Sequence, residues 1–92
     1  MLPRIQSFYF QEDEKKNQFW VGSNEGVYLL DKNFKIIKKF DSNNGLSGTY
    51  IYGIILDDFG KVWCSHQRGL SSIDAKNYSI INFDKEDGIQ HW

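Results

Sequence analysis

The chain has 92 residues, with 11 basic residues against 12 acidic ones and a formal net charge of −1 at pH 7. A chain of this length is at most one domain, and because it hides only about 60% of its unfolded surface, its core is thin. The balanced and scattered charge excludes a basic nucleic-acid-binding stripe. No window approaches the roughly 18 apolar residues that cross a bilayer.

The residue types favour strands. The 7 Phe, 5 Tyr and 3 Trp are many for this length, and with frequent Ile and Val they predict an all-β fold. Cys64 has no second cysteine and no partner at metal-ligand spacing, so it is predicted to be a small buried apolar residue. Residues 1–7 lack the basic start and apolar run of a secretory signal, and the compartment stays undetermined.

Four short strands are predicted in the first half of the chain. They cover residues 5–11, 18–23, 27–31 and 35–40, with turns at 12–17, 24–26 and 32–34. The first of these turns is charged and therefore solvated, so it tolerates extra length. Helical periodicity is missing; the best candidate, 34–40, lacks a cap and sufficient length.

The second half follows the same plan. Strands are predicted at 50–56, 62–65, 70–74 and 78–83, with turns at 57–61, 66–69 and 75–77. In the first of these turns an aspartate accepts backbone N–H bonds and Gly60 supplies a positive φ. In the third, Asn77 is expected to adopt the left-handed conformation.

The two halves are copies of one repeat. Six residues recur at a spacing of 43 positions: Trp20 and Trp63, Gly26 and Gly69, Asp31 and Asp74, Phe40 and Phe83, Asp41 and Asp84, Gly45 and Gly88. A fixed period of this size is typical of stacked or circular arrays. Four short antiparallel strands per unit favour propeller blades, with blade one from 5 to 40, blade two from 50 to 83, and the tryptophans filling the gaps between blades.

Several short motifs together resemble a known family. In the second half these are Asp57-Asp58-Phe59-Gly60-Lys61-Val62-Trp63, Arg68-Gly69-Leu70 and Phe83-Asp84-Lys85-Glu86-Asp87-Gly88. In the first half they are Phe19-Trp20-Val21-Gly22-Ser23, Glu25-Gly26-Val27-Tyr28 and Asn44-Gly45-Leu46-Ser47. In this order and spacing the chain resembles the two-component regulator propeller repeat over almost its whole length.

The resemblance implies a fold and a function. It divides the chain into blade one at 1–46 and blade two at 47–92, where 84–92 corresponds to the linker to a third blade. Such blades build the periplasmic sensor region of bacterial hybrid two-component receptors, many of which respond to carbohydrate breakdown products. The chain departs from the family at Cys64-Ser65-His66, where an aliphatic residue, glycine and threonine are usual. Two blades are also fewer than the roughly four to eight that close a propeller.

Candidate ligand-binding residues lie in one predicted turn. His66, Gln67 and Arg68 share a turn at a blade rim, where propellers bind ligands, although exposed turn residues are the simpler interpretation. His91 and Trp92 lie at the chain end. Tyr50 and Tyr52 could stack on a sugar, but packing explains them more simply. His66 and His91 are 25 residues apart with no cysteine or carboxylate cluster, so no metal or cofactor is predicted.

The acidic residues are predicted to be structural. Asp58-x-Gly60-x-x-Trp63 resembles the Asp-box of sialidases, a motif that stabilises a hairpin. The carboxylates that could be paired for glycoside hydrolysis are Asp13, Glu14, Asp57, Asp58, Glu86 and Asp87. All are expected in solvated turns or linkers.

Three functions remain open. The favoured one is a segment of a ligand-sensing propeller that binds an oligosaccharide and catalyses nothing itself, any kinase lying elsewhere in the parent protein. The second is a structural module that self-associates through exposed blade faces. A glycoside-processing enzyme is the least favoured, because no acid and nucleophile are placed on strand ends around a common axis.

Overall fold

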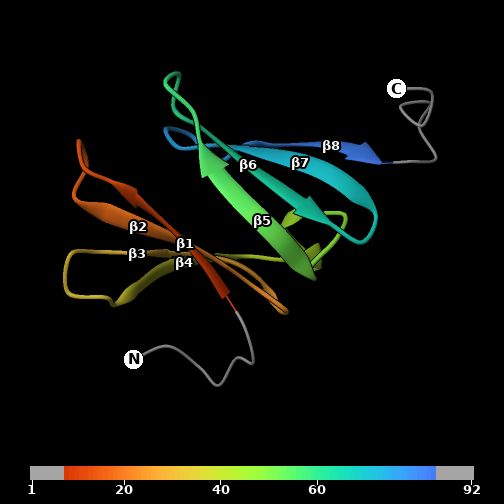
Figure 1. Cartoon of the computed structure of the whole chain (residues 1–92), viewed down its shortest axis with the longest axis horizontal. Helices are drawn as coiled ribbons and strands as arrows, with labels where there is room; N and C mark the ends of the chain where they lie inside the picture. Colours follow the sequence, from red (N-terminus) through yellow and green to blue (C-terminus); the bar gives the residue numbers. More distant parts are fainter. Residues whose placement is uncertain (1–7, 85–92) are drawn as a thin grey trace.

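A computed structural model of the chain, which describes residues 8–84, contains two four-stranded antiparallel sheets side by side (Figure 1). The first sheet is made of β1 (Phe8–Asp13), β2 (Gln18–Ser23), β3 (Gly26–Leu30) and β4 (Ile36–Phe40). The second is made of β5 (Ile51–Leu56), β6 (Lys61–His66), β7 (Gly69–Asp74) and β8 (Ile80–Asp84). The all-β fold of two four-stranded units expected from the sequence is confirmed. Within residues 8–84 no helix has the length and apolar character needed to span a membrane.

Each sheet is a simple meander, in which strands that follow one another in sequence are hydrogen-bonded neighbours. The two sheets meet where β5 of the second packs beside β1 and β2 of the first. Gly22 in β2 allows this approach, because a Cβ at that position would lie only 2.6 Å from Cγ2 of Ile51 in β5. Glycine is therefore required where the two sheets come closest.

The main core lies between the sheets. It joins Trp20, Val27, Leu29 and Phe40 of the first sheet to Ile51, Ile54, Val62, Cys64 and Ile73 of the second, with Leu46 and Ala75 from the connections. Trp20 is fully buried, and its ring stacks on Phe40 at a centroid distance of 5.7 Å. The expected role of Trp20 between two blades is confirmed.

The repeat gives each sheet two distinct faces. Residues opposite one another in an antiparallel pair share a face, and Trp20 shares one with Leu29. We call the face that bears Trp20 or Trp63 the trailing face and the other the leading face. The core is formed by the trailing face of the first sheet and the leading face of the second.

A short connection of ten residues joins the two sheets. It contains one 3-10 helix, η1 (Ser42–Asn44), which the sequence analysis did not expect. Asp41 starts it by accepting the Asn43 backbone N–H, while the Asn44 side chain accepts the Asp41 N–H. Gly45 ends it at φ 102°, a left-handed conformation that suits glycine.

The predicted strands are close to those observed, with small corrections. Gln18–Ser23 is observed as predicted, whereas β1 extends beyond Gln11 to Asp13 and β8 begins at Ile80 instead of residue 78. The start of the first predicted strand, at 5–7, lies outside the described residues. In the turn before β8, Tyr78 adopts the left-handed conformation expected of Asn77, at φ 66°.

Candidate functional site

The antiparallel meanders give the molecule two rims. We call one the linker rim; it carries the turn between β2 and β3, the turn between β6 and β7, and the connection at 41–50. The opposite rim carries the hairpins at 14–17 and 57–60 and the turns at 31–35 and 75–79. The predicted ligand residues His66, Gln67 and Arg68 all lie at the linker rim.

His66 is not the turn residue that the sequence suggested. It is the last residue of β6 and only 3% exposed, on the leading face that packs toward the first sheet. Its Nδ1 accepts the backbone N–H of Arg68 at 3.2 Å, so the ring proton sits on Nε2, which lies 2.8 Å from the Ser71 hydroxyl. The expectation of an exposed His66 was wrong, because the ring is buried on the face of β6 that packs toward the first sheet.

A chain of hydrogen bonds continues from His66 to the connection. The Ser71 hydroxyl donates to Oδ1 of Asn82 at 2.7 Å, and the same oxygen accepts the backbone N–H of Ser47 at 3.1 Å. The Asn82 amide donates to the carbonyl of Gly45 at 2.8 Å. Because Asn82 binds both Gly45 and Ser47, this network holds the connection against the second sheet.

The charge of His66 is suppressed by its surroundings. Burial lowers the pKa of the imidazole below its ordinary value, an effect opposed by nearby Asp84 and reinforced by Arg68. Gly48 lies directly against the ring, since a Cβ there would be 2.1 Å from His66 Nδ1. His66 is therefore a neutral structural residue in a tight site.

Gln67 and Arg68 form the two-residue turn between β6 and β7, and both are exposed. Gln67 Oε1 accepts the backbone N–H of Tyr50 at 3.0 Å. Arg68 Nε lies 3.6 Å from Oδ2 of Asp84, whose Oδ1 accepts a hydrogen bond from the Ser47 hydroxyl at 2.5 Å. The turn thus presents an amide that is bonded to the connection and a guanidinium that is paired with β8.

Two tyrosines stand beside this turn. Tyr50 is 50% exposed and Tyr52 is 52% exposed, and their rings meet edge to face at a centroid distance of 5.9 Å. A β-bulge between Ile51 and Gly53 makes Tyr52 the extra residue in β5, which lets Ile51 and Ile54 both face the core. Contacts among residues 8–84 therefore cover only about half of each ring.

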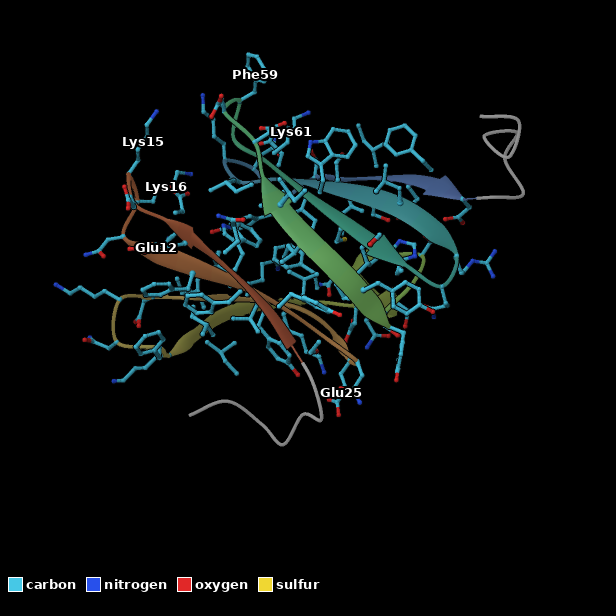
Figure 2. The ribbon with its side chains drawn as sticks, in the orientation of Figure 1. Glu12, Lys15, Lys16, Glu25, Phe59 and Lys61 are labelled. Carbon is cyan, nitrogen blue, oxygen red and sulfur yellow. The ribbon has the colours of Figure 1, made fainter. Side chains whose placement is uncertain are left out.

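A cleft of about 740 Å³ lies at the opposite rim, between the hairpins at 14–17 and 57–60. Figure 2 shows Lys15 and Lys16 at the first hairpin and Phe59 and Lys61 at the second, whereas Glu25 lies at the linker rim. Lys16 Nζ crosses between the sheets and donates to the Ala75 carbonyl at 2.9 Å. Lys16 thereby holds the two sheets together at this rim.

The carboxylate that anchors the second hairpin is Asp57. Its Oδ1 accepts the backbone N–H groups of Phe59 and Lys61 at 2.8 and 2.9 Å, and its Oδ2 accepts the Trp63 indole N–H at 2.9 Å. The bond from Trp63, followed by the backbone bonds, holds the pKa of Asp57 below its ordinary value against a smaller opposing effect of desolvation. The sequence motif predicted that Asp58 stabilises this hairpin. The residue that does so is Asp57, one position earlier, whereas Asp58 is exposed.

The other acidic candidates are divided between strand and turn positions. Asp13 ends β1, is only 8% exposed and accepts the backbone N–H of Lys16 at 3.3 Å, which corrects its placement in a solvated turn. Glu14 is exposed in the hairpin. Glu86 and Asp87 lie outside the described residues, as do His91 and Trp92. Among residues 8–84, no cluster of three or more His, Cys, Asp or Glu side chains could hold a metal.

Cys64 is buried as predicted, at 1% exposure, and burial raises the pKa of its thiol to about 12. The thiol therefore stays protonated and unreactive at neutral pH. The residues that sequence reasoning missed at the linker rim are Ser47 and Asn82. The sequence carried no signal for Asn82, because a polar residue that alternates with Ile81 and Phe83 in a strand is expected to face outward.

Comparison with known proteins identifies the architecture. No protein-family model matches the sequence, and no curated protein matches it. Two solved structures from B. thetaiotaomicron are similar in fold. One is the extracellular domain of BT4673, described as a one-component system, with a TM-score of 0.73 and 24% identity over 82% of this chain and 12% of that one.

The second is the extracellular domain of BT3049, described as a hybrid two-component system. It gives a TM-score of 0.74 and 23% identity over 88% of this chain and 11% of that one. The chain has the fold of part of these extracellular domains. The resemblance to the two-component regulator propeller repeat is thus confirmed at the level of the fold, as two propeller-like blades. The chain matches only 12% and 11% of the lengths of these two domains.

Proposed function

We propose that this chain is a segment of a ligand-sensing propeller in a receptor of the two-component type, and that the ligand is an oligosaccharide. The observation that carries the proposal is the fold itself, because both similar structures are extracellular domains of signalling systems. A blade contributes binding surface and no chemistry. The hydrogen bonds that Asp57 makes within its own hairpin agree with a structural role for that carboxylate.

The linker rim supplies the groups that a sugar requires. Half-exposed tyrosine rings offer apolar faces for a pyranose, while Gln67 and Arg68 offer an amide and a guanidinium for hydroxyl groups. Bulges commonly re-aim a side chain beside a functional site, and the bulge at Tyr52 agrees with that use. The periplasmic location that the resemblance implies belongs to the same proposal.

Titration of the chain with a panel of oligosaccharides, followed by backbone amide NMR, tests this proposal. We expect shifts at the linker rim and a loss of affinity of about three- to tenfold in Tyr52→Ala, since one ring contact is removed. Lys76→Ala, an exposed change at the opposite rim, is the matched control. Absence of shifts with every sugar in the panel, or equal effects of both variants, would contradict oligosaccharide binding at this rim.

A second candidate function is self-association. The trailing face of the second sheet exposes Ile55 at 63% and Ile81 at 49%, whereas the same face of the first sheet is covered by the second sheet. An apolar face of this kind favours a protein partner. Light scattering over a range of concentrations tests it, and a folded monomer at every concentration would contradict it.

A further inference from the structure

His66 stands at the junction between the buried core and the exposed turn of the linker rim. Its side chain is buried, whereas Gln67 and Arg68, the two residues that follow it, are both exposed. This turn carries two of the polar groups of the proposed sugar site. A change in the state of the His66 ring therefore acts directly beside that site.

Both nitrogens of the His66 ring have hydrogen-bond partners. Nδ1 accepts the backbone N–H of Arg68 at 3.2 Å, and Nε2 lies 2.8 Å from the hydroxyl of Ser71. Because a backbone N–H can only donate, the bond to Arg68 requires Nδ1 without a proton. The neutral ring with its proton on Nε2 is therefore the form that satisfies both partners.

A second proton on the ring breaks the bond to the turn. The imidazolium ion carries an N–H at each nitrogen and has no acceptor, so its Nδ1–H and the backbone N–H of Arg68 point at each other. The ring has little room to turn away, since a Cβ on Gly48 would lie 2.1 Å from Nδ1 and Ser71 holds Nε2 on the other side. The exposed turn is the part that yields.

Among residues 8–84, two charged groups act on the ring. Burial lowers the pKa of His66, Asp84 in β8 raises it, and Arg68 in the turn lowers it. The neighbours of the ring in β5, β7 and the connection are uncharged: Ile51, Ser71 and Gly48. The ring is therefore neutral at neutral pH and takes up its second proton in mild acid.

We propose that protonation of His66 opens the Gln67-Arg68 turn and thereby weakens sugar binding at the linker rim. The proposal rests on the oligosaccharide site proposed above and adds its control by acid. The effect reaches beyond the turn, because Oε1 of Gln67 accepts the backbone N–H of Tyr50 at 3.0 Å. An open turn releases this amide and moves the guanidinium of Arg68, so both polar groups of the site leave their positions. By linkage, a sugar that requires the closed turn favours neutral His66 by the same factor.

NMR of the backbone N–H groups between about pH 5 and pH 8 tests the opening of the turn without any ligand. We expect the signals of Arg68 and Tyr50 to shift with the same midpoint as the His66 ring. Below that midpoint, the Arg68 N–H should also lose its protection from exchange with solvent. The N–H of Phe59 is the internal control, because it bonds to Asp57, whose lowered pKa keeps that carboxylate ionised over this range.

His66→Asn is the matched variant. Its Oδ1 can accept the Arg68 N–H in place of Nδ1, and an amide does not titrate, so we expect a closed turn at every pH in this range. Circular dichroism checks that the variant is folded. If it is unfolded, the common midpoint of ring and turn in the unaltered chain decides the question.

The second measurement uses an oligosaccharide that binds in the panel titration described above. Its affinity is compared at about pH 7.5 and at a pH below the His66 midpoint. We expect binding to be about three- to tenfold weaker at the lower pH, the worth of one hydrogen bond. In His66→Asn the affinity should be the same at both pH values.

The outcomes separate this inference from the function on which it rests. A His66 ring that stays neutral down to about pH 5, or an Arg68 N–H that does not follow the titration of the ring, would overturn the inference. Sugar binding that is independent of pH while the turn opens would overturn the control by acid and leave the sugar site standing. If no sugar binds, the proposed function is wrong, and the NMR midpoints still decide whether the turn opens.

Discussion

Trp63 donates its indole N–H to the carboxylate of Asp57 at 2.9 Å, whereas the indole N–H of Trp20, at the same place in the first repeat, is buried with no hydrogen-bond partner among residues 8–84. Asp13 lies seven positions before Trp20, whereas Asp57 lies six positions before Trp63, and Asp13 accepts a bond from the backbone of Lys16 instead. The two tryptophans therefore stabilise the molecule differently, one through a hydrogen bond and the other through burial.

Replacing Asp57 by alanine should lower the thermal midpoint of the chain, because the Trp63 indole and two backbone N–H groups lose their acceptor. The indole proton of Trp63 should also exchange faster with solvent, as followed by NMR. Asp58→Ala is the control, and it should leave both properties about unchanged because Asp58 is exposed. Equal effects of the two substitutions would contradict the assignment of the hairpin carboxylate.

Trp20→Ala should destabilise the chain by about 3–5 kcal/mol, the usual cost of deleting a large buried ring. Because small domains are stable by only about 5–15 kcal/mol, little cooperative unfolding should remain. Trp63→Ala should cost only about 1–2 kcal/mol, since that ring is already partly in solvent. Urea unfolding followed by circular dichroism measures both, and a larger loss in Trp63→Ala would show that the second face is covered.

Gly48→Ala should destabilise the chain by about 1–3 kcal/mol, because the new methyl group would overlap the His66 ring. Most of this loss should disappear when the same change is made in His66→Ala, which removes the ring. A double-mutant cycle from urea unfolding should give a coupling of about 1–2 kcal/mol. Additive effects would mean that Gly48 is needed for its backbone conformation and not for its contact with His66.

The stability of the chain should rise with pH in the range where histidine titrates. The pKa of His66 is lower in the folded state than in the unfolded chain, where it has its ordinary value of about 6.5. At a pH between these two pKa values the unfolded chain therefore binds more protons than the folded one. The contribution of neutral His66 is therefore complete above that ordinary value and is lost as the pH falls below it. The groups facing the ring are Asp84 and Arg68.

The measurement is urea unfolding at intervals between pH 5 and pH 8, with His66→Gln as the comparison. The variant keeps a polar side chain that does not titrate, so its stability should change less across this range. The His66 prediction fails if the two proteins show the same dependence on pH.

The repeat pattern was sufficient to predict the strands, because alternating apolar residues and turn glycines are local signals. Both ends of the strand Gln18–Ser23 were predicted correctly. For every other strand, the predicted ends that fall in residues 8–84 lie within two residues of the observed ends. Errors arose where a backbone conformation was decided by something outside the local sequence. Phe34 and Tyr78, with φ of 63° and 66°, adopt a conformation that such side chains rarely take.

The linker rim could not be predicted in the same way. His66 looked like a turn residue because Gln67-Arg68-Gly69 follows it. Its ring packs against Gly48, which lies in the connection before β5 and is separated from His66 by the whole hairpin β5–β6, so the contact cannot be read locally. The exposure of Tyr52 likewise depends on a bulge in β5 that no residue type predicts.

The bonds from Asn82 to Gly45 and Ser47 join positions 37 and 35 residues apart, whereas the hairpins that build each sheet connect near neighbours. Closing a short loop costs less chain entropy than closing a long one, so each meander can form early and independently. We therefore expect the connection to dock onto β8 after the meanders have formed, so that substitutions at Asn82 change the rate of this late step more than the rate at which each meander forms.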